Sequence, residues 1–314
     1  MSAGDLAEGV LRGEVRAVAR AISLVENAGP GLRALTEELV KGMREPYRAR
    51  VVGLTGAPGV GKSTSTGTLI EAARARGERV AVLAVDPSSP FTGGALLGDR
   101  VRMQAHATDP GVFIRSMATR GHLGGLAWAA PQAIRVLDAA GYDLILVETV
   151  GVGQAEVDIA SLADSTIVLL APGMGDSVQA AKAGILEIAD VFVVNKADRD
   201  GAQETVRDLR NMVALSGSRD WRPPIVSTVA ARGEGAADLV AALDRHAEHL
   251  AASGEGRARR LARARDEIEA IVLTGLRARM GEISGDRHLD ALAEALLAAK
   301  TDPYRAADQV IAAL

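Results

Sequence analysis

Short, nearly continuous apolar runs fill the middle of the chain. Runs rich in Val, Ile and Leu without alternation are typical of parallel strands that helices cover on both faces. Between these runs lie segments with helical spacing, at 62–77, 125–141 and 177–190. The alternation of strand and helix predicts an α/β protein with a doubly wound, mostly parallel sheet. The predicted strands are RVVGLTG (50–56), VAVLAVD (80–86), VFIRSM (112–117), DLILVET (143–149), TIVLLAP (166–172), VFVVNKAD (191–198) and PIVST (224–228).

Both ends of the chain have a helical pattern instead. Before residue 49, two helical stretches are separated by the turn sequence NAGPG at 27–31. After the predicted linker ASGEGR at 252–257, we expect helices at 261–280, 289–300 and 303–314. The pattern predicts an N-terminal helical extension at 1–48, an α/β domain at 49–250 and a C-terminal helical segment at 251–314. This last segment either packs on the α/β domain or pairs with a second copy.

The composition of the chain argues against several classes of protein. The chain has 314 residues, 48% of them hydrophobic and 24% charged, as in ordinary globular proteins. A formal charge of −4 gives no basic field for nucleic acid, so we expect no such partner. The chain contains no cysteine, which excludes disulfides and thiolate metal sites and fits a reducing cytoplasm. Because neither a signal peptide nor a long apolar stretch is present, we expect a cytoplasmic protein without a membrane span.

The histidines do not suggest a metal site. His246 and His249 stand three residues apart on an Ala/Leu-rich helix, whereas the other histidines are scattered. A lone pair of this kind lacks the further ligands that a closed metal site needs. We therefore interpret the pair as part of a solvated helix face.

A phosphate-binding loop follows the first predicted strand. Residues 56–63, GAPGVGKS, match G-x-x-x-x-G-K-[ST] between a strand and a helix, a context that a chance Gly-rich turn does not explain. In such a loop backbone N–H groups and the helix N-terminus bind phosphate, Lys62 reaches the β/γ oxygens, and Ser63 gives one oxygen to Mg²⁺. The predicted nucleotide-binding residues are Gly56, Ala57, Pro58, Gly59, Val60, Gly61, Lys62, Ser63 and Thr64.

Acidic residues end two of the apolar runs. Glu148 follows LILV, and Asp86 closes VAVLAVD. In a parallel sheet the ligand crevice lies at the carboxyl ends of the strands, so both carboxylates are expected near Mg²⁺. Either one alone would be an ordinary strand-end polar residue. Next to a phosphate loop, Gly151 offers an N–H to a γ-phosphate, and Gln154 is a candidate for positioning water.

A second motif indicates which base is bound. Asn195-Lys196-Ala197-Asp198 follows the strand VFVV and matches N-K-x-D, the guanine-reading element of GTPases. The Asp198 carboxylate can accept hydrogen bonds from guanine N1–H and the 2-amino group, a pair of donors that adenine lacks. The sequence therefore predicts GTP rather than ATP. The loop VAARGEG (229–235) would supply N–H groups to guanine O6, from Val229, Ala230 and Ala231.

Taken together, these segments resemble the MeaB/ArgK-type G proteins, also described as LAO/AO transport-system ATPases. The resemblance implies a GTPase that converts GTP and water to GDP and phosphate, slowly when alone and faster with its partner. That partner is adenosylcobalamin-dependent methylmalonyl-CoA mutase, whose cofactor loading and protection the GTPase gates. The segments that carry the resemblance are GAPGVGKST (56–64), VDPSSPFTGGALLGDRVRM (85–103), SMATRGHLGGL (116–126), VETVGVGQAEVD (147–158), APGMGD (171–176), KAGILEIADVFVVNKAD (182–198) and RGEG (232–235).

The resemblance also implies residue roles. Asp86, Asp99 and Glu148, with Ser63, match the family's magnesium and switch positions. Lys182 lies in a segment, about 173–187, that the family uses to communicate with its partner. We further expect the C-terminal helices to form a homodimer. The implied catalytic set is Lys62, Asp99, Glu148, Gln154 and Lys182.

Some questions stay open at this point. Val229 replaces the Ser that the family tends to have; guanine affinity falls if that hydroxyl braces the loop and changes little otherwise. Any of Arg100, Arg102 and Arg120 could supply charge to the transition state. Two rival functions are a P-loop kinase or ATPase acting on a small molecule or in transport, and a module that binds nucleotide without hydrolysing it.

Overall fold

The structure is a computed structural model of the chain. It describes residues 2–27, 29–43, 45, 48–87, 106, 108–119, 125–149, 155–173, 187–215 and 220–313. The chain divides into two compact units, Met1–Arg263 and Ala264–Leu314. The first unit carries the sheet and the candidate site.

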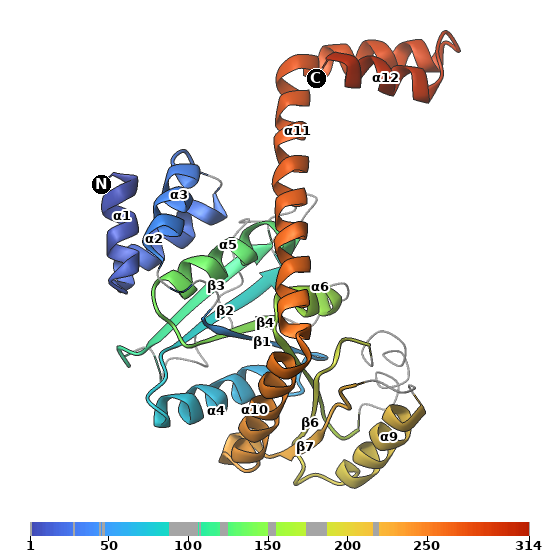
Figure 1. Ribbon diagram of the computed structural model, residues 1–314. Helices are drawn as coiled ribbons and strands as arrows, with labels where there is room; N and C mark the ends of the chain where they lie inside the picture. Colours follow the sequence, from blue (N-terminus) through green and yellow to red (C-terminus); the bar gives the residue numbers. More distant parts are fainter. Residues whose placement is uncertain are drawn as a thin grey trace. The chain divides into compact units, whose positions relative to one another are not determined.

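Seven strands form one sheet in the order β3-β2-β4-β1-β5-β6-β7 (Figure 1). Each neighbouring pair is parallel, so the predicted fold class is confirmed. The strand before the phosphate loop, β1, lies between β4 and β5, with Leu54 in register with Glu148. The strands are β1 Arg50–Thr55, β2 Val80–Pro87, β3 Val112–Thr119, β4 Leu144–Thr149, β5 Ser165–Leu170, β6 Val191–Asn195 and β7 Ile225–Thr228.

Alternate residues of the central strands enter two different cores. In β2, Ala81, Leu83 and Val85 join one apolar cluster, whereas Val80 and Val82 join another on the opposite face. Helices α5 (Gly125–Ala139) and α6 (Ala155–Leu162) cover the first face, and α4 (Lys62–Ala75) and α10 (Ala236–Ser253) cover the second (Figure 1). Burial on both faces explains why the strand sequences are apolar without alternation.

Helix α9 (Ala202–Leu215) covers the β5–β6 side of the sheet through a third cluster. Neither α6 nor α9 was predicted from the sequence pattern. The helix expected at 177–190 falls largely outside the described residues, which resume at residue 187. Helices are thus placed on both faces of the sheet, as the doubly wound arrangement requires.

The N-terminal extension contains three described helices, so the prediction of two was wrong. They are α1 (Ala3–Leu11), α2 (Val15–Glu26) and α3 (Leu32–Gly42). The break falls at Gly13, whose φ of 72° is open to glycine at little cost. Gly13 N–H donates to Val10 O, and Glu14 N–H donates to Gly9 O, which ends α1. The apolar faces of these helices join the same core as α5.

The C-terminal region also differs from the prediction. The expected linker at 252–257 is a sharp turn at Gly254 (φ 76°), after which α11 begins at once. Helix α11 runs over Glu255–Leu297, where two helices were expected, and α12 spans Pro303–Ala313. Residues 281–288, GEISGDRH, contain no proline, and an isolated glycine costs about 1 kcal/mol without ending a helix.

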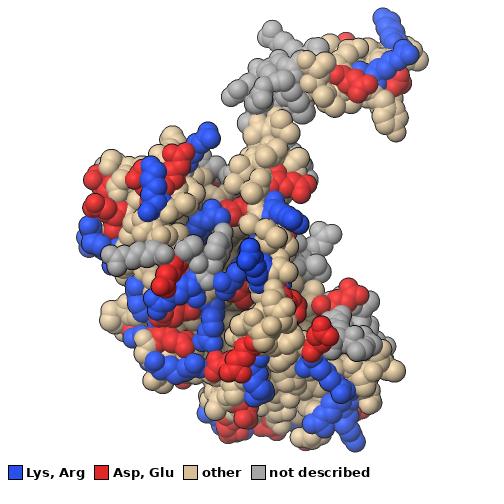
Figure 2. Space-filling view, in the orientation of Figure 1, with Lys and Arg blue, Asp and Glu red and all other residues tan. Residues whose placement is uncertain are grey.

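Acidic and basic side chains are interspersed over the face drawn in Figure 2. Among the charged side chains of the described residues, Arg50 contacts Glu78 and Asp244, and Asp244 also contacts Arg76. Among the helices of the described residues, none is long and apolar enough to cross a membrane.

Candidate functional site

The phosphate loop joins the end of β1 to the start of α4. Gly56 has a φ of 143°, and a Cβ there would lie 2.3 Å from the carbonyl oxygen of Leu169. Gly61 has a φ of 98°, and its Cβ would lie 2.3 Å from Asn195 Nδ2. Both positions therefore require glycine. The tight loop leads directly into α4, and the N-terminus of a helix, where the first N–H groups point away from the helix, is a place where anions bind.

Lys62 lies over this loop. Its Nζ donates to the carbonyl oxygens of Gly56 at 2.7 Å and Ala57 at 3.1 Å, and the side chain is buried. A buried ammonium group is costly without hydrogen-bond partners. The loop's own carbonyls thus hold the positive charge beside the groups that would bind phosphate.

Glu148 and Ser63, both predicted as metal-binding residues, are brought together. Ser63 Oγ donates to Glu148 Oε1 at 2.7 Å, and Thr66 Oγ1 lies 2.8 Å from Glu148 Oε2. Glu148 is only 3% exposed, so the sheet holds a carboxylate in its interior beside the phosphate loop. Sequence reasoning missed Thr66, although it follows Ser63 by three residues and so shares its helix face.

Asp86 lies at the carboxyl end of β2, two strands from β1. Its backbone is in register with Ala118 of β3. This is the edge of the sheet where the phosphate loop begins, because all the strands run in parallel. The other predicted site residues Asp99, Gly151, Gln154 and Lys182 lie outside the described residues, as do Arg100, Arg102 and Arg120.

Asn195 connects three segments of the site. Its Nδ2 donates to Val60 O in the phosphate loop at 2.8 Å. Its Oδ1 accepts from Ala230 N at 3.0 Å and from the Thr228 hydroxyl at 3.1 Å. Next along the chain, Lys196 donates from Nζ to Gly59 O at 2.6 Å. The phosphate loop, the N-K-x-D motif and the loop after β7 therefore form one continuous surface.

The loop after β7 is closed largely by its own backbone. Val229 N–H donates to Glu234 O at 3.1 Å, and Arg232 N–H donates to Val229 O at 2.8 Å across the short 3₁₀ helix η2 (Ala230–Arg232). The hydroxyl that reaches Asn195 belongs to Thr228. Closure of this loop therefore needs no hydroxyl at position 229. Asp198 and Ala231 are exposed beside it, with Asp198 Oδ2 3.6 Å from Arg232 Nη2.

A second polar cluster lies at the opposite edge of the sheet. Asp164 and Asp190 precede β5 and β6, and the first turns of α11 bring arginines to both. Arg259 binds Asp190 through two hydrogen bonds of 2.9 Å, whereas Arg260 and Arg263 bind Asp164 at 3.0 Å. We call these five side chains the arginine anchor. It fastens the start of α11 to the base of the sheet.

The anchor shifts the ionisation of its carboxyl groups. Burial raises the pKa of Asp164, but hydrogen bonds and charge from Arg260 and Arg263 outweigh burial and hold that pKa below its usual value. Burial acts in the same sense on Asp190, and the contact with His246 and the hydrogen bonds from Arg259 likewise bring its pKa below the usual value. Both groups are therefore carboxylates at neutral pH.

The prediction that His246 and His249 form a solvated face was wrong. His246 is fully buried, with Nδ1 2.7 Å from Ser165 Oγ and Nε2 3.3 Å from Asp190 Oδ1. Both imidazole rings pack against Trp221. Helical spacing alone gave no sign that Trp221 and Asp190 meet this face. Within the described part of the chain, no three His, Cys, Asp or Glu side chains form a cluster that could hold a metal ion.

The sequence matches a known family over most of its length. Residues 18–283 match the family described as Methylmalonyl Co-A mutase-associated GTPase MeaB. A Pyrococcus abyssi protein whose name describes it as a GTPase is 48% identical, over 98% of this chain and 95% of the relative's chain. GTPase ArgK of Escherichia coli is 39% identical over 79% of this chain and 78% of its own.

Two further comparisons agree. The mouse protein named methylmalonic aciduria type A homolog, mitochondrial, is 36% identical over 80% of this chain and 65% of its own. A crystal structure described as a LAO/AO transport system kinase aligns with a TM-score of 0.72 and 27% identity over 98% of this chain and 96% of that one. The sequence matches agree with a site in which a phosphate loop and a guanine motif meet. The chain therefore belongs to the MeaB family of GTPases.

Proposed function

We propose that this GTPase gates the loading of adenosylcobalamin into methylmalonyl-CoA mutase and protects that enzyme. The observation that carries the nucleotide half of the proposal is the Asn195 side chain, which is bonded to both Val60 O and Ala230 N. Because of this link, the state of the phosphate loop and that of the base loop are coupled. The mutase half rests on the family's name and on the mouse relative.

Ser63 and Glu148 fit a magnesium ion. Both present oxygen atoms, which Mg²⁺ prefers, and Mg²⁺ at nucleotide sites is usually held by one or two carboxylates together with phosphate oxygens and water. A buried carboxylate beside the phosphate loop also matches the charge of a divalent cation. We propose Ser63 and Glu148 as ligands of this ion, with Asp86 and Asp99 as the further candidates from the sequence. When bound, Mg²⁺ would neutralise charge on the β- and γ-phosphates.

Hydrolysis in this proposal is in-line attack of water on the γ-phosphate, in which catalysis is mostly positioning and charge neutralisation. Lys62 would move from the carbonyls of Gly56 and Ala57 to the phosphate oxygens, exchanging neutral acceptors for charged ones. Gln154 would orient the water, and Gly151 would sense the γ-phosphate. Lys182 would relay the nucleotide state to the partner.

We also propose that the second unit makes a homodimer. Helix α11 exposes apolar side chains at helical spacing, and such a stripe is costly in water unless another surface covers it. A second copy of the same helix would cover it symmetrically. We place the dimer in the cytoplasm, in keeping with a chain that has no cysteine. The exposed residues are Ile268, Ile271, Val272, Leu273 and Leu276.

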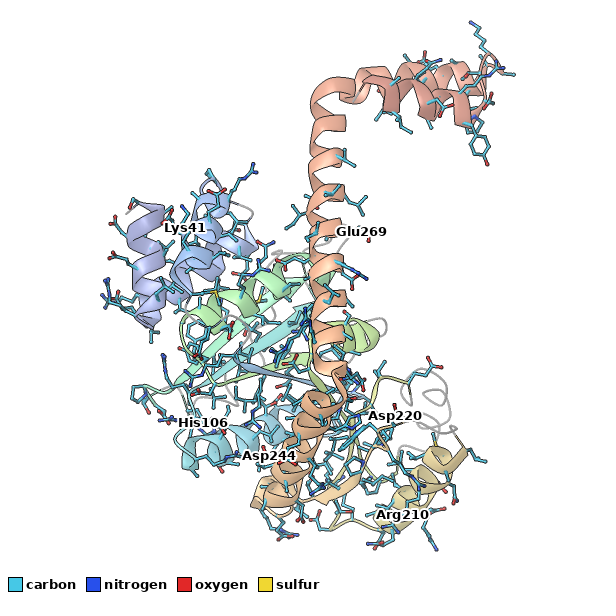
Figure 3. The ribbon with its side chains drawn as sticks, in the orientation of Figure 1. Lys41, His106, Arg210, Asp220, Asp244 and Glu269 are labelled. Atoms are coloured by element: carbon cyan, nitrogen blue, oxygen red, sulfur yellow. The ribbon has the colours of Figure 1, made fainter. Side chains whose placement is uncertain are left out.

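Cofactor transfer tests the proposal. Adenosylcobalamin would be offered to apo-mutase in the presence of this protein and GTP, GDP or a non-hydrolysable GTP analogue, and loading would be followed by the visible absorption of the cofactor. Loading that depends on which nucleotide is bound is the expected result. The variant Lys62→Ala removes the lysine of the phosphate loop and is tested in the same assay. Its matched control is Lys41→Ala, which changes an exposed lysine of α3 (Figure 3). Loading indifferent to nucleotide would contradict gating.

A P-loop kinase is the rival, since the aligned crystal structure is described as one. Product analysis separates the two functions. A GTPase releases inorganic phosphate in step with GDP, whereas a kinase transfers the phosphoryl group to a small acceptor. Phosphate release that requires an added acceptor would favour the rival.

A further inference from the structure

We propose that Thr68 is a positioning residue for guanine recognition, which it aids by fixing the peptide between Ala230 and Ala231. This inference rests on the proposed role of the loop after β7 in reading guanine O6. Thr68 lies on α4, the helix that begins at Lys62. It carries no part of the phosphate-loop motif, so sequence matching does not single it out.

The evidence is a hydrogen bond between distant parts of the chain. Thr68 Oγ1 donates to Ala230 O at 3.1 Å, across 162 residues. The same oxygen lies 3.1 Å from Thr64 O, one turn earlier on α4. A hydroxyl group has one hydrogen, so it donates to one of these carbonyls at a time or is shared between them. The bond to Ala230 is the one that joins α4 to the base loop.

The peptide bond makes this contact directional. The C=O of Ala230 and the N–H of Ala231 belong to one planar trans unit, so they point in opposite directions. When Thr68 and the Gly233 N–H hold the Ala230 oxygen, the Ala231 N–H is turned the opposite way. That N–H is one of those expected to read guanine O6. The hydroxyl of Thr68 therefore acts on recognition without touching the base.

The opposite side of Ala230 is fixed independently. Its N–H donates to Asn195 Oδ1 at 3.0 Å, and the Asn195 amide in turn donates to Val60 O. Ala230 is thus held on one side by the motif that reads the base and on the other by the helix that follows the phosphate loop. From Lys62 to Thr68 the helix rises about 9 Å, so one rigid element sets the position of both ends of the nucleotide.

The test compares three nucleotides. GDP and IDP both carry O6, whereas ADP carries an amino group there; fluorescent derivatives of each would be titrated into wild-type and variant protein. Thr68→Val keeps the branched shape and removes the hydroxyl. One lost hydrogen bond corresponds to about a fivefold change in the dissociation constant. We expect this loss for GDP and IDP alike, no change for ADP, a higher KM for GTP and an unchanged kcat.

Two further variants isolate the hydroxyl. Thr68→Ser retains it and should restore GDP affinity to within about twofold of wild type. Thr205→Val on α9 removes a hydroxyl whose bond to Gly201 O, at 3.1 Å, is of the same local kind as that between Thr68 and Thr64. It should leave nucleotide binding unchanged. Thr68→Ala serves as a second deletion if Thr68→Val does not fold.

The outcomes are distinguishable. Unchanged GDP affinity in Thr68→Val, an equal loss for ADP, or a failure of Thr68→Ser to rescue would each overturn the role of Thr68. If the wild-type protein itself does not prefer GDP to ADP, then guanine recognition by this loop fails, and the proposed function fails with it. Preference for GDP in wild type that narrows in Thr68→Val and returns in Thr68→Ser supports the inference.

Discussion

Replacing Asp164 tests how firmly the arginine anchor holds α11 on the sheet. Asp164 Oδ1 lies 3.0 Å from Arg263 Nη2, and Oδ2 accepts from Arg260 at 3.0 Å and from the Val51 N–H at 3.1 Å. Asp164→Asn keeps the shape of the side chain. It removes the negative charge and turns one acceptor into an N–H₂ group that faces other donors. The buried guanidinium of Arg263 would then lose the carboxylate that it contacts here.

The magnitude follows from the burial of the partners. Removing one member of a buried ion pair costs about 3–5 kcal/mol. Arg263 is 10% exposed, but Arg260 is 33% exposed, so water screens the second pair. We therefore expect a loss in the free energy of unfolding near the lower end, about 3 kcal/mol. For a protein of this size, that loss lowers the melting temperature by about 6–12 °C.

Urea unfolding followed by far-UV circular dichroism measures this cost. Asp244→Asn is the matched control: Asp244, on α10 (Figure 3), binds Arg50 at 2.7 Å and Arg76 at 2.9 Å but is 35% exposed. Its loss should cost less than about 1 kcal/mol. Adding Arg263→Met to Asp164→Asn should recover part of the stability, because the buried cation is gone. The reasoning is refuted if Asp164→Asn costs no more than Asp244→Asn.

Further predictions concern pH, the nucleotide site and the second unit. Because the pKa values of Asp164 and Asp190 lie below the usual range, their stabilisation is complete above about pH 5 and disappears as pH falls through the ordinary carboxyl range towards the folded pKa. Acid unfolding should therefore be steeper in wild type than in Asp164→Asn; parallel curves would contradict this. Gly61→Ala should abolish GTP binding in a titration, whereas Gly59→Ala, whose Cβ enters open space, pays only about 1–2 kcal/mol of backbone strain. Glu148→Gln should raise the Mg²⁺ concentration for half-maximal hydrolysis at least about tenfold, because it removes a carboxylate charge beside the phosphate loop. Deleting residues 264–314 keeps the arginine anchor and should give a monomer by light scattering that still binds GTP; a surviving dimer would place the interface elsewhere.

Much of the geometry of the candidate site was predictable from the sequence. Parallel strands share one carboxyl edge, so a motif after β1 and a glutamate ending β4 must lie close together, as Ser63 and Glu148 do. The N-K-x-D motif ends β6 on the same sheet, and Asn195 accordingly reaches Val60. In both cases the shared direction of the parallel strands determines which strand ends meet in space.

The parts that escaped prediction depend on contacts between distant segments. Asp164 and Asp190 each precede a strand, where an acidic residue is an ordinary turn signal, and nothing nearby in the sequence indicates that Arg263 and Arg259 will contact them.

 The separations are 99 residues from Asp164 to Arg263 and 69 residues from Asp190 to Arg259. His246 was misread for the same reason, because its partners come from β5, from the turn before β6 and from Trp221. Local periodicity reports which face of a helix is apolar, but not which buried polar groups will meet it.

The helix boundaries show a related limit. The apolar spacing of residues 3–26 continues through Gly13, so a single helix fitted the pattern equally well. The break is decided by backbone bonds that close only once the chain reverses at Gly13. In α11 the opposite happened, since separate helices were expected at 261–280 and 289–300, and the helix continues through Gly281 and Gly285 between them. Glycine permits a turn without requiring one.

The measurement that tests the central claim most directly is GTP hydrolysis by the purified protein, with and without methylmalonyl-CoA mutase from the same organism. Phosphate release would be recorded over a titration of the mutase, with Lys62→Ala and Lys41→Ala as variants. The account predicts slow release that rises with the mutase, is lost in Lys62→Ala and is kept in Lys41→Ala. Release that is indifferent to the mutase, or that survives in Lys62→Ala, would contradict it.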